Sequence, residues 1–227
     1  MNKAMTKLEE EKFIKDAYES LINRGVIKSE DIEPSPVTDA DLDEFEKEFN
    51  IKIPSLYRTF LKTYCCDFDN GQINGVVPLD IDEETIEDEE TELDTLWLEL
   101  VTVTNGKNPL QNLYNSMNGF REVVTDEDLI GMTSESCSHL LPIGDWGAGW
   151  GPLCFDLTCP EESVDFKDTD TWSLVWFDHE EFDWDELYLC DDGLVHGDPI
   201  IPDFKTLIEW YFFGKLIPKY EEQEKED

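Results

Sequence analysis

Residues 41–61 read DLDEFEKEFNIKIPSLYRTFL, and this stretch predicts two short helices joined by an extended link. The apolar residues of its first half recur at helical spacing: Leu42, Phe45 and Phe49. Thr38 is a suitable N-cap before them, and Asn50 can end this first helix. Pro54 suits the first position of the second helix. The apolar face of that second helix consists of Leu56, Tyr57, Phe60, Leu61 and Tyr64.

Outside this stretch, the pattern predicts one earlier helix, several strands and a closing helix. The earlier helix is expected over 7–24, and the weakly patterned middle allows helices near 110–117 and 126–132. Asn70-Gly71 and Asn74-Gly75 are turn signals. Strands are expected at 73–79, 140–143, 153–157, 172–177 and 187–189. The closing helix is expected at 204–212. Because helices and strands are segregated along the chain, the expected fold class is α+β.

One strand and one turn carry further information. The 172–177 segment is apolar on both faces apart from Ser173, as expected for a central strand covered on both sides. The 144–151 segment is rich in glycine, but it lacks the spacing of a phosphate-binding loop. Asp145 inside this turn would also repel a phosphate. The glycines are therefore expected to serve the tight turn, not a nucleotide.

Charge is the outstanding feature of the composition. The 227 residues include 17 Lys and Arg against 55 Asp and Glu, a formal net charge of −38. Such a surplus repels nucleic acids and anionic membranes, and it attracts basic proteins and cations. Solubility alone is the competing explanation, because net charge by itself specifies neither fold nor partner. The densest acidic block runs from Asp80 to Glu99. It can equally be a contact surface for a basic partner or a solvated loop.

The location and redox state follow from what the sequence lacks. The N-terminus has no apolar targeting segment, and no apolar run approaches the length of a membrane span. The six cysteines form no CxxC pair, which favours reduced thiols. We therefore expect a cytoplasmic protein, and the high net charge favours a monomer when the protein is free.

Four segments in the same order resemble the SUKH superfamily, which includes the fungal Smi/Knr cell-wall assembly regulators and many bacterial immunity proteins. The 41–61 stretch resembles its opening pair of helices. Leu141-Pro142-Ile143-Gly144, the glycines of 147–151 and Phe155-Asp156 resemble its strand, glycine turn and strand. Val175-Trp176-Phe177-Asp178-His179-Glu180 resembles a later strand, and 204–213 resembles its last helix. The likeness spans roughly Asp39 to Phe213.

The resemblance implies an α+β fold with a mixed or antiparallel sheet flanked by helices. It also implies a protein-binding role without a catalytic constellation, so neither an enzyme nor a cofactor is expected. In bacteria, such proteins neutralise a contact-delivered toxin, often a nuclease. A regulatory scaffold like the Smi/Knr proteins is the alternative. We expect one domain over 1–220, with the helix at 7–24 as an extension, an acidic insertion at about 80–99 and a charged tail at 221–227.

The partner is expected to be a basic protein, with no role for nucleic acid or membrane. The residues expected to contact it are acidic or aromatic: Asp82, Glu83, Glu84, Glu87, Asp88, Glu89, Glu90, Asp145, Trp146, Trp150, Asp178, Glu180, Glu181, Asp183 and Trp184. Tryptophan is common at interface hot spots, but these rings can equally belong to the core. A weaker hypothesis uses His179 with Asp178 and Asp183 as metal ligands. A Cys–His nucleophile would draw on His139, His179 or His196.

Overall fold

The computed structural model describes residues 5–66, 72–76, 95–146, 149, 151–158 and 172–215. The helices are α1 (Lys7–Asn23), α2 (Asp39–Phe49), α3 (Ser55–Thr63), α4 (Gln111–Thr125), α5 (Trp184–Leu187) and α6 (Phe204–Tyr211), with a 3-10 turn η1 (Ser29–Asp31). The strands are β1 (Ile32–Pro34), β2 (Tyr64–Cys66), β3 (Gln72–Val76), β4 (Thr95–Leu100), β5 (Leu140–Trp146), β6 (Pro152–Asp156), β7 (Leu174–Trp176) and β8 (Asp198–Ile201). The α+β prediction is confirmed.

The main sheet has six strands in the order β3-β4-β5-β6-β7-β8, and every neighbouring pair is antiparallel. The strands β1 and β2 form a separate antiparallel pair. Strand order therefore follows chain order, and the register joins Leu141 to Phe155 and Cys154 to Val175. Of the two sheet types that the family resemblance allowed, the protein has the antiparallel one.

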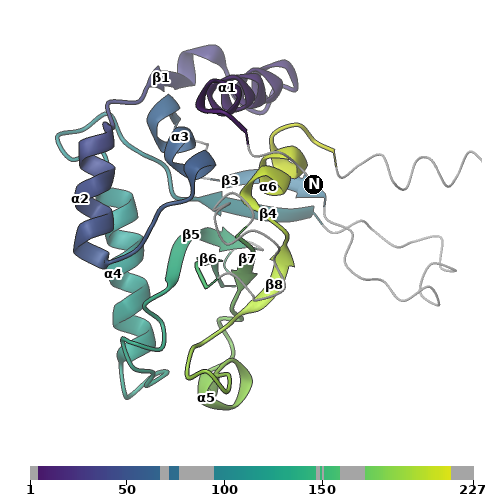
Figure 1. The fold of residues 1–227 in the computed structure, drawn as a ribbon. Coiled ribbons are helices and arrows are strands. Elements are labelled where there is room, and N and C mark those ends of the chain that lie inside the picture. Colours follow the sequence, from purple (N-terminus) through teal and green to yellow (C-terminus); the bar gives the residue numbers. More distant parts are fainter. Residues whose placement is uncertain are drawn as a thin grey trace, which may run out of the picture.

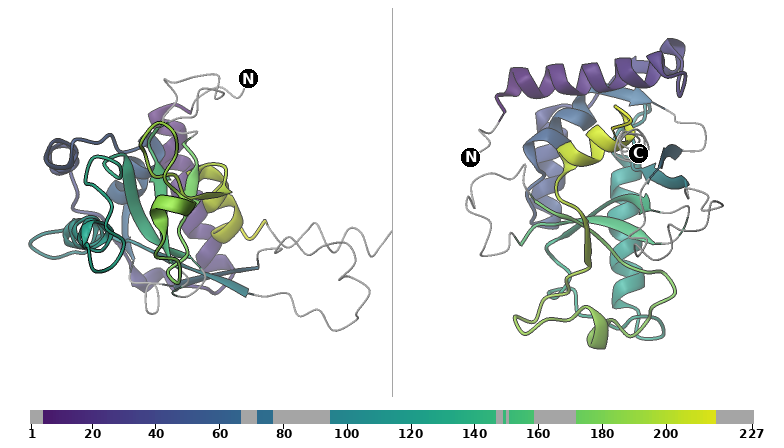
Figure 2. Two further views of the ribbon diagram at one scale, coloured as in Figure 1. Left: turned by 90° about the horizontal axis from the view of Figure 1, so that it is seen from below. Right: turned by 90° about the vertical axis from the view of Figure 1, so that its right-hand side faces the viewer.

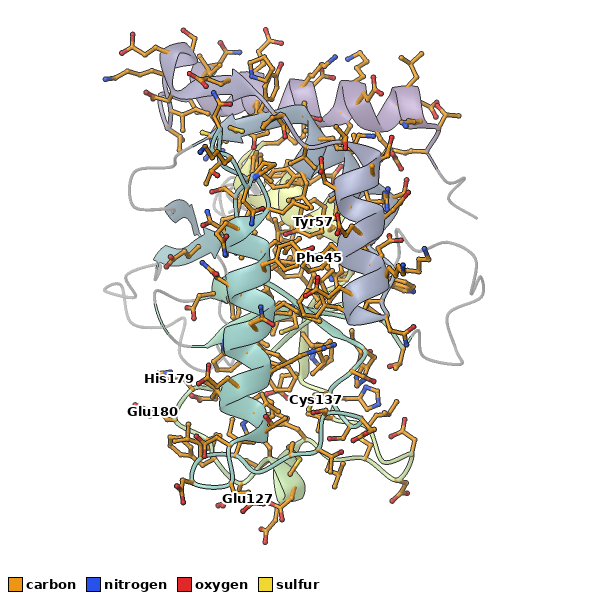
Figure 3. The ribbon with its side chains drawn as sticks, turned by 90° about the vertical axis from the view of Figure 1, so that its left-hand side faces the viewer. Phe45, Tyr57, Glu127, Cys137, His179 and Glu180 are labelled. Carbon is orange, nitrogen blue, oxygen red and sulfur yellow. The ribbon has the colours of Figure 1, made fainter. Side chains whose placement is uncertain are left out.

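The helices cover the sheet from one side and one end (Figure 1). Figure 2 shows α1 lying across one end of the molecule and α5 at the opposite end. Helices α2 and α4 run side by side, with Phe45 behind them (Figure 3), and the rings of Phe45 and Tyr114 lie 5.0 Å apart. This arrangement places α5 at the end of the molecule opposite α1.

Both faces of the central strands are buried. One face carries Leu141, Leu153 and Leu174 and joins the main core, which also contains side chains of every long helix. The opposite face, with Leu140, Cys154 and Val175, belongs to a second, smaller cluster. Because successive residues of a strand point to opposite faces, these strands need apolar side chains at consecutive positions. The prediction that 172–177 contains a strand covered on both faces is confirmed.

The predicted helix pair in 41–61 is confirmed by its caps. Thr38 and Asp41 form a capping box at the start of α2, in which the Thr38 hydroxyl accepts from the Asp41 N–H. Asn50 ends α2 in the left-handed conformation, with φ of 55°. Pro54 was predicted at the first position of the second helix, but it is the N-cap of α3, and the helix begins at Ser55.

Several boundaries differ from the sequence prediction. The segment predicted as strand 187–189 begins with the end of α5, because Trp184 and Tyr188, four residues apart, both turn into the second cluster. The segment 126–132 forms turns, and Gly131 has a φ of 71° that a helix cannot accommodate. Asn74-Gly75 is no turn: it lies inside β3, paired with Leu96 and Trp97. Strands β1, β2 and β8 were not predicted.

Candidate functional site

The end of the molecule opposite α1 is formed by residues 126–129 and 178–192, which we call the acidic end. The first part is the turn after α4, and the second runs from the end of β7 through α5. Figure 3 shows Glu127 and Glu180 among the side chains at this end. The two parts meet through the second hydrophobic cluster, in which Phe120 of α4 lies 6.2 Å from the Trp184 ring.

Aromatic packing fixes the longer part of the acidic end to the sheet. The Trp184 ring stacks on Phe177, with centroids 4.4 Å apart and planes inclined by 13°. Tyr188 meets both rings edge to face. The Trp184 indole N–H donates to the Glu181 carbonyl at 2.8 Å, which closes the loop before α5. These contacts anchor the loop before α5 to the end of β7.

The charges of the acidic end are almost all of one sign. Among residues 122–158 and 172–204 that the structure describes, there is no Lys or Arg. In this part of the chain the ion pairs of the acidic end are those of Asp178 with His179 and Asp192 with His196. The exposed carboxylates of the acidic end are Asp126, Glu127, Asp128, Glu180, Glu181, Asp183, Asp185, Glu186, Asp191 and Asp192.

Acidic residues near the N-terminus have a different environment. Arg58 donates to Glu46 at 2.8 Å and to Asp43 at 2.9 Å, and Lys62 bonds to Asp39 at 2.7 Å. The negative charge on α2 is therefore partly neutralised within the fold. The acidic end has no described Lys or Arg to neutralise its charge, so its field extends into solvent.

Apolar side chains are exposed among these carboxylates. Phe182 and Leu187 are 53% and 54% exposed, and Leu129 and Leu189 are 47% and 40% exposed. Of the seven large apolar side chains exposed in the described residues, four therefore lie at the acidic end. A set of apolar groups rimmed by charge is typical of a protein-binding surface.

The structure brings part of the predicted contact set together. Asp178, Glu180, Glu181 and Asp183 lie in the acidic end. Trp184 lies beneath them and is 2% exposed, so it supports the surface as a core residue. The predicted contact residues that fall outside the described residues are Asp82, Glu83, Glu84, Glu87, Asp88, Glu89, Glu90 and Trp150.

Asp145 and Trp146 occupy the end of β5. Burial raises the pKa of Asp145, and Glu99 directly across the strand pair adds to the effect, although the N–H groups of Gly149 and Gly151 oppose it. Trp146 is 8% exposed, and its indole N–H donates to the Tyr211 hydroxyl at 2.9 Å. Trp146 is thus a second tryptophan that belongs to the core.

The thiols of the described core do not fit nucleophilic catalysis. Burial raises the pKa of the Cys137 thiol and that of the Cys154 thiol, so both stay protonated near neutral pH. Cys65 and Cys190 form no disulfide in the described part of the chain. For His179, Asp178 lies at 3.8 Å, but the described residues supply no third metal ligand there.

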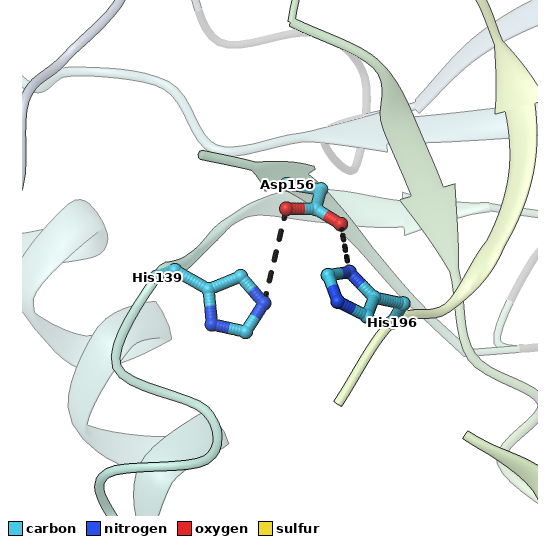
Figure 4. A group of neighbouring side chains, drawn as sticks. All are labelled: His139, Asp156 and His196. Carbon is cyan, nitrogen blue, oxygen red and sulfur yellow. Dashed lines mark hydrogen bonds and ion pairs between the residues drawn. The ribbon is translucent and has the colours of Figure 1, made fainter. Parts of the chain in front are cut away.

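A different group of possible ligands was missed in the sequence. His139, Asp156 and His196 come from three separate segments and converge on one point (Figure 4). Nδ1 of His196 lies 2.6 Å from Oδ2 of Asp156, and Nε2 of His139 lies 3.8 Å from Oδ1. Their spacing along the chain, 17 and 40 residues, matches no local motif. Only the pairing of β5 with β6, of β6 with β7 and of β7 with β8 brings them together.

The protonation of this cluster follows from its neighbours. Burial alone would lower the pKa of His196, but hydrogen bonds to Asp156 and Asp192 outweigh it and raise the pKa. Burial lowers the pKa of His139, which holds this ring neutral. Burial alone would raise the pKa of Asp156, but hydrogen bonds from Thr158 and His196 lower it. The neighbours thus favour the charged forms of His196 and Asp156 and the neutral form of His139.

Comparison with known proteins gives one clear finding. The model of the SMI1 / KNR4 family (SUKH-1) matches residues 36–210, which is more than half of the chain. No curated protein matches the chain. Within the described residues, no helix is both long enough and apolar enough to cross a membrane.

Proposed function

The chain belongs to the SMI1 / KNR4 family (SUKH-1), and from this membership we propose that it is an immunity-type protein that binds and neutralises a cognate bacterial toxin. The partner is a basic toxin domain, with a nuclease as the leading candidate class. The chain acts by covering the toxin and has no catalytic step of its own. The acidic end is the proposed contact surface.

The observation that carries this proposal is the combination of charge and exposed apolar groups at the acidic end. A nuclease needs Lys and Arg to hold the phosphates of its substrate. A surface of unpaired carboxylates steers such a protein toward itself and then occupies the groups that would hold phosphate. Phe182 and Leu187 supply apolar area for the centre of the contact, which charge alone does not provide.

The surface is also pre-organised. The stack of Phe177, Trp184 and Tyr188 holds the backbone of the acidic end in place before a partner arrives. Less conformational entropy is then lost on binding, which favours a tight complex. The acidic block at 82–90 is proposed as a second source of attraction, because its carboxylates add to the negative charge that steers a basic partner over long range.

The proposal is tested with the toxin domain that is encoded beside the gene of this protein. The purified chain is used to capture that domain at low and high salt, and cells producing the domain are scored for survival with and without this chain. We expect stoichiometric capture that weakens as salt rises, because screening reduces the attraction between exposed charges. We also expect the chain to restore growth.

Two other outcomes lead elsewhere. Capture of no toxin domain at either salt, together with no protection, would contradict the immunity role and favour a regulatory scaffold like the Smi/Knr proteins. Capture that does not change with salt would retain the immunity role but move the contact away from the acidic end.

A further inference from the structure

The cluster of His139, Asp156 and His196 has the composition of a metal site. His139 directly precedes β5, Asp156 is the last residue of β6, and His196 lies two residues before β8. One ligand atom from each of the three lies within 4.8 Å of the others. Two imidazole nitrogens and one carboxylate oxygen are a ligand set that Zn²⁺ and similar ions prefer.

The groups around the cluster orient two of these ligands. Nε2 of His196 donates to Oδ2 of Asp192 at 3.1 Å, which leaves Nδ1 as the nitrogen that faces Asp156. A ligand histidine whose other nitrogen donates to a carboxylate is the usual arrangement around bound metals. The Thr158 N–H donates to Oδ1 of Asp156 at 2.9 Å, and this bond fixes the carboxylate plane.

His139 completes the set and is incompletely satisfied as it stands. Its side chain is 9% exposed, its Nε2 donates to the Val195 carbonyl at 3.0 Å, and its Nδ1 is buried without a hydrogen-bond partner in the described structure. If Nε2 bound a metal, its proton would move to Nδ1 and the bond to Val195 would be given up. A metal–nitrogen bond replaces that single hydrogen bond.

We propose that His139, Asp156 and His196 bind one divalent transition-metal ion of the Zn²⁺ class. The ion takes the place of the proton between His196 and Asp156, so one proton leaves as the ion enters. Ligand atoms of a tetrahedral zinc site lie roughly 3.3 Å apart, so each ligand has to move by about an ångström or less. A surface cleft of about 440 Å³, lined by His139 and by residues 50–52 after α2, gives the ion access.

The proposed role of the ion is structural. It joins the start of β5, the end of β6 and the segment that carries Asp192 and enters β8, so it fastens the base of the acidic end to the sheet. A ligand that binds only the folded chain raises its stability. This inference rests on the cluster alone and does not depend on a toxin partner.

The test is an isothermal titration calorimetry experiment, in which chelator-treated protein is titrated with ZnCl₂ in the presence of excess Mg²⁺. Mg²⁺ occupies exposed carboxylates, which bind hard ions, and leaves imidazole ligands free for Zn²⁺. We expect one saturable site per chain and a higher melting temperature with Zn²⁺. Co²⁺ in the same protein should give the visible absorption of a four-coordinate ion.

Variants assign the site. His139→Ala and His196→Ala should each weaken Zn²⁺ binding at least 100-fold, and Asp192→Asn should weaken it by about 10- to 100-fold. His179→Ala is the matched control, because this exposed histidine lies outside the cluster, and it should bind like the wild type. Near-ultraviolet circular dichroism checks that each variant is folded. No saturable binding in Mg²⁺, or equal binding by folded His139→Ala, His196→Ala and wild-type proteins, would overturn the proposal.

Discussion

Three carboxylates are buried in the described part of the chain, and each has hydrogen-bond donors. Glu10 accepts from Ser55 and Thr59 at 2.7 and 2.8 Å. Glu46 faces Arg58, and Asp156 faces His196. A buried charge is tolerated only when it is paired or hydrogen-bonded. The other described carboxylates are exposed or half-buried.

Glu46 makes the stability of the fold sensitive to acid. Burial alone would raise the pKa of Glu46, but hydrogen bonds from Lys52, the Ile53 N–H and Arg58 hold it below the usual value of 4.5. Because the folded-state pKa is lowered, the stabilisation is present above the unfolded pKa and is lost as pH falls through the folded pKa. In urea unfolding, Glu46→Gln should lower the free energy of unfolding by about 1–3 kcal/mol at neutral pH. This loss should shrink below pH 4.5.

Glu44→Gln on the same helix is the control, because Glu44 is exposed and should change the unfolding free energy by less than about 0.5 kcal/mol. If the difference in unfolding free energy between Glu46→Gln and wild type stayed constant as the pH falls, it would contradict the lowered pKa of Glu46.

Gly144 is predicted to be irreplaceable, because a Cβ there would lie 2.0 Å from the Glu99 carbonyl oxygen of the neighbouring strand. Gly144→Ala should therefore force β4 and β5 apart and cost about 3 kcal/mol or more. Gly119, inside α4, has no atom within 4 Å of a Cβ, so Gly119→Ala should stabilise the protein by about 0.5–1 kcal/mol. Thermal unfolding compares the two. Equal melting temperatures for the two variants would refute this prediction.

At the scale of elements, α1 is an integral part of the fold although it precedes the family match at residue 36. Ile14, Ala17 and Leu21 on α1 are fully buried in the main core. The Arg24 guanidinium donates to the carbonyls of Tyr211 and Phe212 at 2.8 and 2.9 Å, so it caps the end of α6. Helix α1 thus packs on the main core and is joined by Arg24 to the end of α6.

Arg24→Ala should loosen this closure. It removes two charge-assisted hydrogen bonds to the last carbonyls of α6, and we expect a loss of about 1–2 kcal/mol in the free energy of unfolding. Lys28→Ala is the control, because Lys28 is exposed and its only ion pair in the described residues, with Glu30, is exposed as well. Chemical denaturation measures both variants. A loss no larger for Arg24→Ala than for Lys28→Ala would show that α1 does not hold α6.

The elements that the sequence predicted well are those with a long apolar period or a distinctive cap. The caps at Thr38 and Asn50 gave α2 its correct start and end. Strands β1 and β8 have only three and four residues, too few for alternation to be visible. The segment 187–189, predicted as a strand, contains the last residue of α5 and only a single bridge, from Leu189 to Val195. Short elements that depend on tertiary contacts leave little local signal.

The site was predicted only in part, for a reason of the same kind. Asp178, Glu180, Glu181 and Asp183 are contiguous, so their charge was visible in the sequence. The turn with Asp126, Glu127 and Asp128 is more than 40 residues away, and only the packing of α4 against Trp184 brings it to the same end. The cluster of His139, Asp156 and His196 likewise depends on strand pairing that no local pattern specifies.

At the scale of the whole molecule, positive and negative charges are separated. Most of the described cations lie on or beside α1 to α3 and near α6, where several pair with acids such as Asp39 and Glu209, while Lys107 and Arg121 lie before and on α4. The acidic end has no Lys or Arg partner in the described residues, so it dominates the long-range field on its side of the molecule. A basic partner would approach along this field, and the rate of its association would fall as salt rises.

The most direct test of this account is the dissociation constant of the toxin domain for two matched triple variants at physiological salt. One variant is Glu180→Gln, Glu181→Gln and Glu186→Gln at the acidic end. The other is Glu19→Gln, Glu30→Gln and Glu44→Gln outside it, with the same change in charge. We expect the first to bind at least about 10-fold more weakly and the second within about 3-fold of wild type. Equal weakening in both variants, or wild-type binding by the first, would contradict the acidic end as the contact surface.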